Sequence, residues 1–383
     1  MNNLNESRVA WLLPNMGTGG ISFQHILGEF SKLFPNTVTF TGQWPGYVSG
    51  YENAFNIQKV GATKYIEFWR TAKGYTLGFS YVSPQIITQL LRFKPDVIFA
   101  NAFTAWTALA LLLKPIGGWK VIITYEGGAA IYETASSVIR YRARQLMARF
   151  ADGFVVNSQA GMSYLLNTLD VDSQQIVAKP FLVPCIKALS HSLKLANLPE
   201  DNSVQRPIFL FVGQIVPRKG LKTLLEACSQ LQQMGYDNYT LMIVGEGKQR
   251  PELEKYVLQT GLEQQIAWTG KVPYAQLGAY FKFADVFVFP THDDIWGMVI
   301  PEAMAFGKPV ICSTGAGAAE MVKEKHNGFL FEPEQAEYLA KLMGLFIEDL
   351  SLAKKMGHNS LSSMTDHTPE HAASYFAKAL EAA

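Results

Sequence analysis

Residues 291–311 read Thr-His-Asp-Asp-Ile-Trp-Gly-Met-Val-Ile-Pro-Glu-Ala-Met-Ala-Phe-Gly-Lys-Pro-Val-Ile and follow an apolar run over residues 284–290. That run is typical of a buried parallel strand. A polar loop leads through Gly297 into a short helix, whose first turn can hold Pro301 and whose end Gly307 can cap. A second apolar strand completes a βαβ unit. In such sheets, ligands bind outside the carboxyl ends of the strands.

Two acids lie on this turn. Asp294 and Glu302 would be ~12 Å apart along the axis if the segment between them were fully helical. One acid can then contact a sugar while the other contacts a ribose, with helix amides facing the phosphates between them. We expect Gly297, Met298 and Val299 to supply backbone amides there.

The composition fits well-covered α/β sheets. The chain has 383 residues, with 48% hydrophobic and 17% charged residues, which suits two domains and excludes a disordered chain. A net charge of +1 gives no global field to attract nucleic acid. The three scattered cysteines lack metal-like spacing and favour a reducing cytoplasm. Residues 1–8 do not resemble a signal peptide, and the longest apolar stretch, 105–113, is too short to cross a bilayer.

Apolar strands alternate with helical patterns along the whole chain. This alternation predicts two Rossmann-like, doubly wound parallel-sheet domains facing a cleft. We expect the first domain over residues 1–187, a polar connection over 188–205 and the second domain over 206–365.

Five motifs in the C-terminal half occur in a specific order. They are residues 211–220, 241–247, 268–272, 291–311 and 315–330. Together they resemble the signature of retaining family 4 glycosyltransferases, which have the GT-B fold. The N-terminal half matches only through its opening strand and glycine loop. The resemblance implies that residues 206–365 bind a nucleotide-sugar donor, that residues 1–187 face the acceptor, and that a last helix in 366–383 crosses back to the first domain.

Departure of a nucleoside diphosphate leaves negative charge on the terminal phosphate, so catalysis needs fixed positive charge. Arg218 and Lys219, shortly after the strand that ends at Gly213, are the candidates for this role. The alternative is a solvated pair of surface charges. Gln214 departs from the family, which often has arginine at that position.

The resemblance assigns further donor contacts. Glu302 is expected to accept hydrogen bonds from the ribose hydroxyls, and Asp294, where the family usually has glutamate, to lie near the sugar. Their alternatives are a glutamate placed by the helix dipole and a turn cap. Donor-binding positions are also expected at Gly213 and at two pairs of residues, Gly245 with Gly247 and Lys271 with Val272.

The first domain offers weaker signals. Gly19 and Gly20 follow the first strand, and their amides could face the donor phosphate or the acceptor. Glu126 stands after another strand, where many relatives have histidine, and it is the candidate hydroxyl-binding or proton-handling group. Its alternative is a loop acid beside flexible glycines. Residues 136–150 form a basic, partly amphipathic helical pattern that suits anionic lipid or simply a solvated face.

The resemblance implies a hexosyltransferase that retains anomeric configuration while moving a sugar to an acceptor hydroxyl. Polysaccharide, glycolipid or glycan biosynthesis is the expected setting, and the acceptor could be a glycan, a lipid-linked sugar or a small molecule. No cofactor, metal or nucleic acid is expected. The expected location is the cytoplasm, and peripheral contact with the inner membrane surface stays open. The alternatives are a non-catalytic nucleotide-sugar-binding relative and a GT-B sugar-nucleotide epimerase. Donor sugar, base, acceptor, linkage and oligomeric state stay open at this point.

Overall fold

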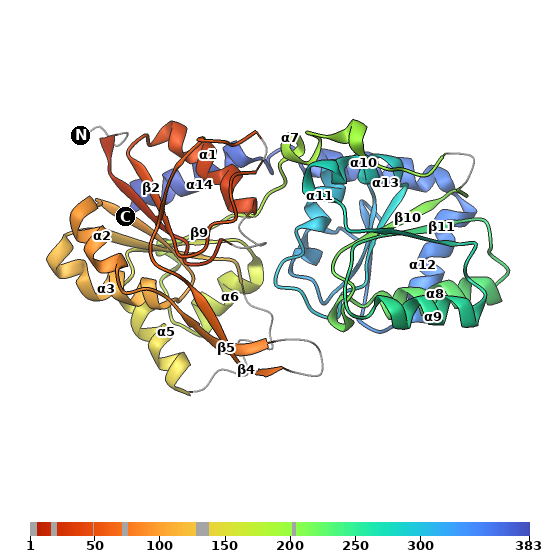
Figure 1. Cartoon of the computed structure of the whole chain (residues 1–383), viewed down its shortest axis with the longest axis horizontal. Helices are drawn as coiled ribbons and strands as arrows, with labels where there is room; N and C mark the ends of the chain where they lie inside the picture. The colour runs from red at the N-terminus through yellow and green to blue at the C-terminus, as the bar shows by residue number, and fades with distance from the viewer. Residues whose placement is uncertain (1–5, 17–20, 49, 71–75, 128–137, 201–203) are drawn as a thin grey trace. The chain divides into compact units, whose positions relative to one another are not determined.

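The structure is a computed structural model that describes residues 6–16, 21–48, 50–70, 76–127, 138–200 and 204–383. Its contacts divide the chain into two compact units (Figure 1). Among the described residues, those up to residue 183 together with 367–383 form unit 1, and those from 184 to 366 form unit 2. Each unit contains a parallel sheet, as predicted.

Unit 1 is built on a seven-stranded parallel sheet of order β3-β2-β1-β6-β7-β8-β9. Its strands are β1 (Val9–Leu12), β2 (Thr37–Thr41), β3 (Asn56–Lys59), β6 (Val97–Asn101), β7 (Lys120–Tyr125), β8 (Gly153–Val156) and β9 (Ile176–Ala178). Its main helices are α1 (Ile21–Leu33), α2 (Ile86–Phe93), α3 (Ala105–Gly117), α5 (Val138–Phe150), α6 (Gln159–Asn167) and α14 (Pro369–Ala382). An antiparallel pair, β4 (Lys64–Arg70) with β5 (Thr76–Tyr81), was not predicted.

Helix α14 belongs to unit 1 although it ends the chain. It packs beside α1, and the ring of Phe376 lies 4.8 Å from that of Trp11, 5.5 Å from Phe99 and 5.3 Å from Phe181. Thr368 caps the start of the helix. An aromatic anchor in the core of unit 1 therefore holds the last helix there.

Unit 2 is built on a six-stranded parallel sheet of order β12-β11-β10-β13-β14-β15. Its strands are β10 (Ile208–Val212), β11 (Thr240–Val244), β12 (Ile266–Gly270), β13 (Val286–Phe289), β14 (Val310–Ser313) and β15 (Gly328–Phe331). Its α-helices are α7 (Ile186–Leu189), α8 (Leu221–Gln233), α9 (Arg250–Thr260), α10 (Leu277–Phe283), α11 (Val299–Ala305), α12 (Ala336–Glu348) and α13 (Leu350–Ser363). Strands, α8 and α12 share one large apolar core.

The described part of the stretch expected as a connection, residues 188–200 with 204 and 205, lies within unit 2 by its contacts. Helix α7 buries Ala188 and Leu189, the amide of Ser192 donates to the carbonyl of Ala275, and the Tyr280 hydroxyl donates to the carbonyl of Asn197. The chain passes from unit 1 to unit 2 between Val183 and Pro184. Two buried apolar side chains and two hydrogen bonds therefore attach this stretch to unit 2.

No helix in the described ranges combines the length and the apolar character that a bilayer crossing requires.

Candidate functional site

The site of unit 2 starts where its strand order reverses. From β10 the chain proceeds to β11 and β12 on one side, whereas β13, β14 and β15 lie on the other. The loops that follow β10 and β13 therefore leave in opposite directions from neighbouring strand ends. Ligands bind parallel α/β sheets at such switch points.

The two loops place Lys219 against Asp294. Lys219 ends the short 3-10 turn η6 (Pro217–Lys219), and its ammonium donates to the carboxylate of Asp294 in a buried ion pair. The same ammonium lies 4.9 Å from the centre of the Phe289 ring, so a cation–π contact also holds it. Burial lowers the pKa of Lys219 from its usual value, and the neighbouring Asp294 carboxylate partly offsets this effect.

The half-buried Arg218 ties the same loops together through its backbone and side chain. Its carbonyl accepts hydrogen bonds from the amide of His292 at 2.8 Å and from the hydroxyl of Thr291 at 3.0 Å. Its guanidinium Nη1 lies 3.4 Å from the carbonyl oxygen of Asp293. The structure thus brings both predicted cations to the loop that carries Asp294.

A third loop, after β14, fixes the backbone of Asp294. The amide of Asp294 donates to the carbonyl of Gly315 at 2.9 Å, and the amide of Gly317 donates to the carbonyl of Asp294 at 3.0 Å. A Cβ on Gly317 would lie 2.1 Å from the carbonyl oxygen of Ile295, so only glycine allows this approach. Three loops therefore determine where the carboxylate lies.

Glu302 occupies the first turn of α11 and is only 3% exposed. Its Oε1 accepts a hydrogen bond from the hydroxyl of Tyr274 at 3.0 Å. Burial raises the pKa of Glu302 to about 8, against the opposing effect of the Tyr274 hydrogen bond. Tyr274 was not predicted from the sequence, where its only signal is its place just after Lys271 and Val272. Gly297 begins the approach to α11 with a φ of +92°, and Met298 and Val299 follow it at the helix start.

This burial makes stability dependent on pH. Because the native pKa of Glu302 lies above its unfolded value, native Glu302 holds more protons between about pH 4.5 and pH 8. The favourable contribution of Glu302 to the free energy of unfolding is present below that window and is lost as the pH rises through about 8. We expect the melting temperature of Glu302→Gln to fall less than that of the wild type between pH 6 and pH 9. The exposed control Glu263→Gln should follow the wild type, and parallel Glu302→Gln and wild-type curves would contradict the assignment.

Glycines allow the loops after β10, β11 and β12 to pack closely against one another. Gly245 has a φ of +149°, and a Cβ there would lie 1.8 Å from the carbonyl oxygen of Gly213. A Cβ on Gly247 would lie 2.1 Å from the carbonyl oxygen of Ile215. The amide of Gly245 donates to the carbonyl of Gly270 at 2.8 Å. These glycines let protein backbone approach closely within unit 2, and donor binding at Gly245 and Gly247 stays a prediction.

The loop contact that supports Lys219 has a direct test. Gly220 has a φ of +67°, and a Cβ there would lie 1.8 Å from the carbonyl oxygen of Pro290. Gly235 has a φ of +88° with open space around it, so it controls for the φ effect alone. We expect Gly220→Ala to lower the free energy of unfolding by more than about 2 kcal/mol, and Gly235→Ala by about 1 kcal/mol. Urea denaturation measures both, and equal losses would contradict the close contact.

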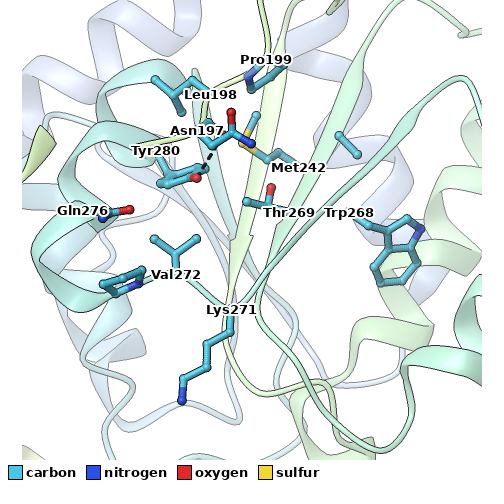
Figure 2. Close-up of a pocket in the computed structure, with 12 residues that line it drawn as sticks. Asn197, Leu198, Pro199, Met242, Trp268, Thr269, Lys271, Val272, Gln276 and Tyr280 are labelled. Carbon is cyan, nitrogen blue, oxygen red and sulfur yellow. Dashed lines mark hydrogen bonds between the residues drawn. The ribbon is translucent and has the colours of Figure 1, made fainter. Parts of the chain in front are cut away.

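Lys271 and Val272 line a cavity of about 390 Å³ beside β11, β12 and α10 (Figure 2). Met242 and Thr269 lie on its strand side and Tyr280 on its helix side. Figure 2 shows the Lys271 side chain extending away from these three residues. The cavity does not include the Lys219–Asp294 pair.

Unit 1 carries the other predicted residues. Glu126 follows β7 and is half-buried; burial raises the pKa of its carboxyl, and a hydrogen bond with Asn101 at the end of β6 opposes the shift. The Ser158 hydroxyl donates to the Glu126 carbonyl at 3.3 Å. Gly19 and Gly20 lie outside the described residues. Within those residues no group of three or more histidine, cysteine, aspartate or glutamate side chains is arranged to hold a metal.

Two family models match the chain. The model "Glycosyl transferases group 1" matches residues 198–362, and "Glycosyl transferase 4-like domain" matches residues 48–181. All the candidate residues of unit 2 fall within the first match.

The chain is similar in sequence to several proteins that are named as sugar transferases. The sulfoquinovosyl transferase SQD2 of Arabidopsis thaliana is 25% identical over 296 residues, which are 72% of this chain and 54% of the relative. A GDP-mannose-dependent α-(1-6)-phosphatidylinositol monomannoside mannosyltransferase of Mycobacterium tuberculosis is 27% identical over 247 residues, 63% of this chain and 60% of the relative. The matched stretches cover 54%, 40% and 44% of three such relatives, so the chain spans about half of their length.

Solved structures share the fold. Alr3699/HepE from Anabaena, in complex with UDP, superposes with a TM-score of 0.75 at 17% identity, covering 98% of this chain and 100% of that one. Sucrose-phosphate synthase from Thermosynechococcus elongatus gives a TM-score of 0.72 at 19% identity, covering 97% of each chain. The two parallel-sheet units therefore have the GT-B fold, as predicted.

Proposed function

Since the chain belongs to the family of group 1, family 4-type glycosyl transferases, we propose that it moves a sugar from a nucleoside-diphosphate sugar to an acceptor hydroxyl with retention of anomeric configuration. The observation that carries this proposal is the convergence of Arg218, Lys219 and Asp294 at the β10–β13 switch point, with a buried carboxyl at Glu302 on the helix that follows. Cations for a leaving diphosphate and acids for hydroxyl groups are thus held by one set of loops.

The cations act on the leaving group. When the bond between the sugar and the diphosphate breaks, negative charge grows on the terminal phosphate oxygens. Lys219 is buried, and Asp294 and Phe289 fix its position, so its charge needs little reorganisation to stabilise that change. Arg218 adds a second cation on the adjacent residue. A preorganised positive charge of this kind favours the transition state over the bound substrate.

The acids act on the two ends of the donor. Glu302 accepts hydrogen bonds from the ribose hydroxyls, which lowers the pKa of its carboxyl and favours the charged form. Asp294 holds a sugar hydroxyl or faces the positive charge that develops on the sugar ring. The leaving phosphate takes the proton of the acceptor hydroxyl on the same face of the sugar. This route requires no protein nucleophile.

The setting that we propose is polysaccharide or glycolipid assembly. The names of the relatives support it: one is a sulfoquinovosyl transferase, and another is a phosphatidylinositol monomannoside mannosyltransferase. The acceptor would then be a glycan or a lipid-linked sugar. The names and complexes of the relatives include both GDP-mannose and UDP, so the donor base is part of the test.

The test is a panel of uridine, guanosine and adenosine diphosphate sugars, incubated with the protein in the presence of a chelator. Nucleotide release from one donor is expected, and proton NMR of the product should show the anomeric configuration of the donor. Inversion would contradict the retaining route. Binding of a donor without turnover across a wide acceptor panel would favour a non-catalytic relative. Three departures from the family support that alternative: Gln214, Asp294 and the absence of a histidine near Glu126.

A further inference from the structure

Helices α3 and α5 of unit 1 contact one another (Figure 1). Both helices expose apolar side chains. The Lys114 ammonium of α3 donates to the carbonyl of Phe150 at the end of α5, at 3.1 Å. Among the described residues, the four most exposed large apolar side chains lie on these two helices: Ile139 at 82%, Ile116 at 76%, Val138 at 75% and Leu112 at 73%. Such a concentration of exposed apolar area on one pair of helices marks an interaction surface.

The outward face of α5 is ordered into two rows. Ile139, Leu146 and Phe150 are spaced at seven and four positions, so they lie along one stripe of the helix. Leu146 is 59% exposed and Phe150 is 55% exposed. Arg142 and Arg149, also seven positions apart, form a parallel row beside that stripe. Ala148 on the opposite side is buried.

Helix α3 carries exposed apolar residues of its own. Met147 of α5 packs in the same apolar cluster as Leu109 and Leu113 of α3, which fixes the sides by which the helices meet. Leu112 and Ile116 are four positions apart, and helical periodicity places them on the neighbouring outward face of α3. We call the outward residues Leu112, Ile116, Ile139, Leu146 and Phe150, with Arg142 and Arg149, the α3–α5 face.

The charge of this face has one sign. Neither helix contains an acidic residue, and α5 has four arginines. Arg144 is turned inward, where its guanidinium donates to the hydroxyl of Tyr164 at 3.0 Å, whereas Arg140, Arg142 and Arg149 are exposed. A hollow of about 770 Å³ lies beside Arg142 and Arg149, and Asp170 and Asp172 of the facing loop line it too. These acids weaken the positive field on that side. A partner that binds this face must therefore contact the apolar row as well as the arginines.

We propose that the α3–α5 face docks the protein on a bilayer that contains anionic lipid. A basic helix with an exposed apolar stripe lies in the plane of such a surface, where its apolar side chains enter the headgroup boundary and its arginines contact lipid phosphates. The apolar row and the arginine row suit these two layers. Each large apolar side chain is already exposed in the folded unit, so docking requires no unfolding. This inference is independent of donor chemistry, because all its residues belong to unit 1.

The test is co-sedimentation of the full chain with vesicles of phosphatidylcholine alone or with phosphatidylglycerol added. We expect binding to the anionic vesicles that weakens as salt is raised. The pair Leu146→Ser with Phe150→Ser should weaken binding roughly tenfold or more, and Arg142→Gln with Arg149→Gln by a similar factor at low salt. The arginine pair should also reduce the salt dependence. A matched control is Met234→Ser with Leu258→Ser, exposed apolar residues of unit 2 that should bind as the wild type does.

Two outcomes would overturn the inference. If the wild type sediments no more with anionic vesicles than with phosphatidylcholine, the face does not dock on anionic lipid. If both variant pairs bind as the wild type does, docking uses another surface. Circular dichroism and nucleotide binding by the same preparations verify folding, and they report on the donor site separately from lipid binding.

Discussion

Lys219→Met is expected to lower kcat for sugar transfer roughly 10²- to 10³-fold, the loss typical when one preorganised donor to a developing oxyanion is removed. Lys219 is buried, pairs with Asp294 and follows directly on Arg218, so no solvent cation can take its place with the same geometry. Methionine keeps most of the chain length and removes the charge. Initial rates at saturating donor measure the effect.

The matched control is Lys222→Met, one turn further along the same segment, where the lysine side chain is 55% exposed. Its kcat should stay within about twofold of the wild type, since surface charges contribute little. Removing Lys219 also leaves the half-buried carboxylate of Asp294 without this ion pair, so the melting temperature must be recorded for both variants. A folded Lys219→Met enzyme with wild-type kcat would contradict the leaving-group role.

Glu302→Ala is expected to raise the donor dissociation constant roughly 100-fold. Hydrogen bonds to a carboxylate contribute about 1.5 to 3 kcal/mol each, and two ribose hydroxyls would lose them. Calorimetric titration with the productive nucleotide measures the loss. Tyr274→Phe is the graded comparison, because it removes only the 3.0 Å hydrogen bond to Glu302 and should cost less than about tenfold. Equal affinities for Glu302→Ala and the wild type would exclude a ribose contact.

The sequence predicted the local pieces of unit 2 well. The βαβ segment around residues 291–311 has its strand at β13, its helix at α11 and its second strand at β14, because apolar runs and glycine caps act over a few residues. Register and strand order are not local properties, and the antiparallel β4–β5 pair was missed for that reason.

The contacts between site residues were beyond the sequence. Lys219 and Asp294 are separated by 75 positions and meet only because β10 lies next to β13 in the sheet. Tyr274 reaches Glu302 across 28 positions, and the burial that raises the pKa of Glu302 arises from packing around α11. The motifs suggested roles for Lys219, Asp294 and Glu302, but they did not show which residues of the protein these side chains contact.

Unit 1 shows the same limit. Its aromatic anchor for α14 joins Trp11, Phe99 and Phe181 to Phe376, residues from four distant segments whose apolar character alone gave no sign of the pairing. Glu126 remains a prediction as a hydroxyl-binding or proton-handling group. Its half-buried carboxyl and its bond to Asn101 describe its surroundings within unit 1.

The central claim is that the switch-point loops of unit 2 bind the diphosphate and ribose of a nucleotide sugar. Calorimetric titration of the wild type and of Lys219→Met combined with Glu302→Ala, with UDP, GDP and ADP in turn, tests it most directly. We predict that one nucleotide binds the wild type and that the double variant, folded by circular dichroism, loses at least about 100-fold in affinity. Equal binding to both proteins, or no binding of any of the three nucleotides to the wild type, would contradict the account.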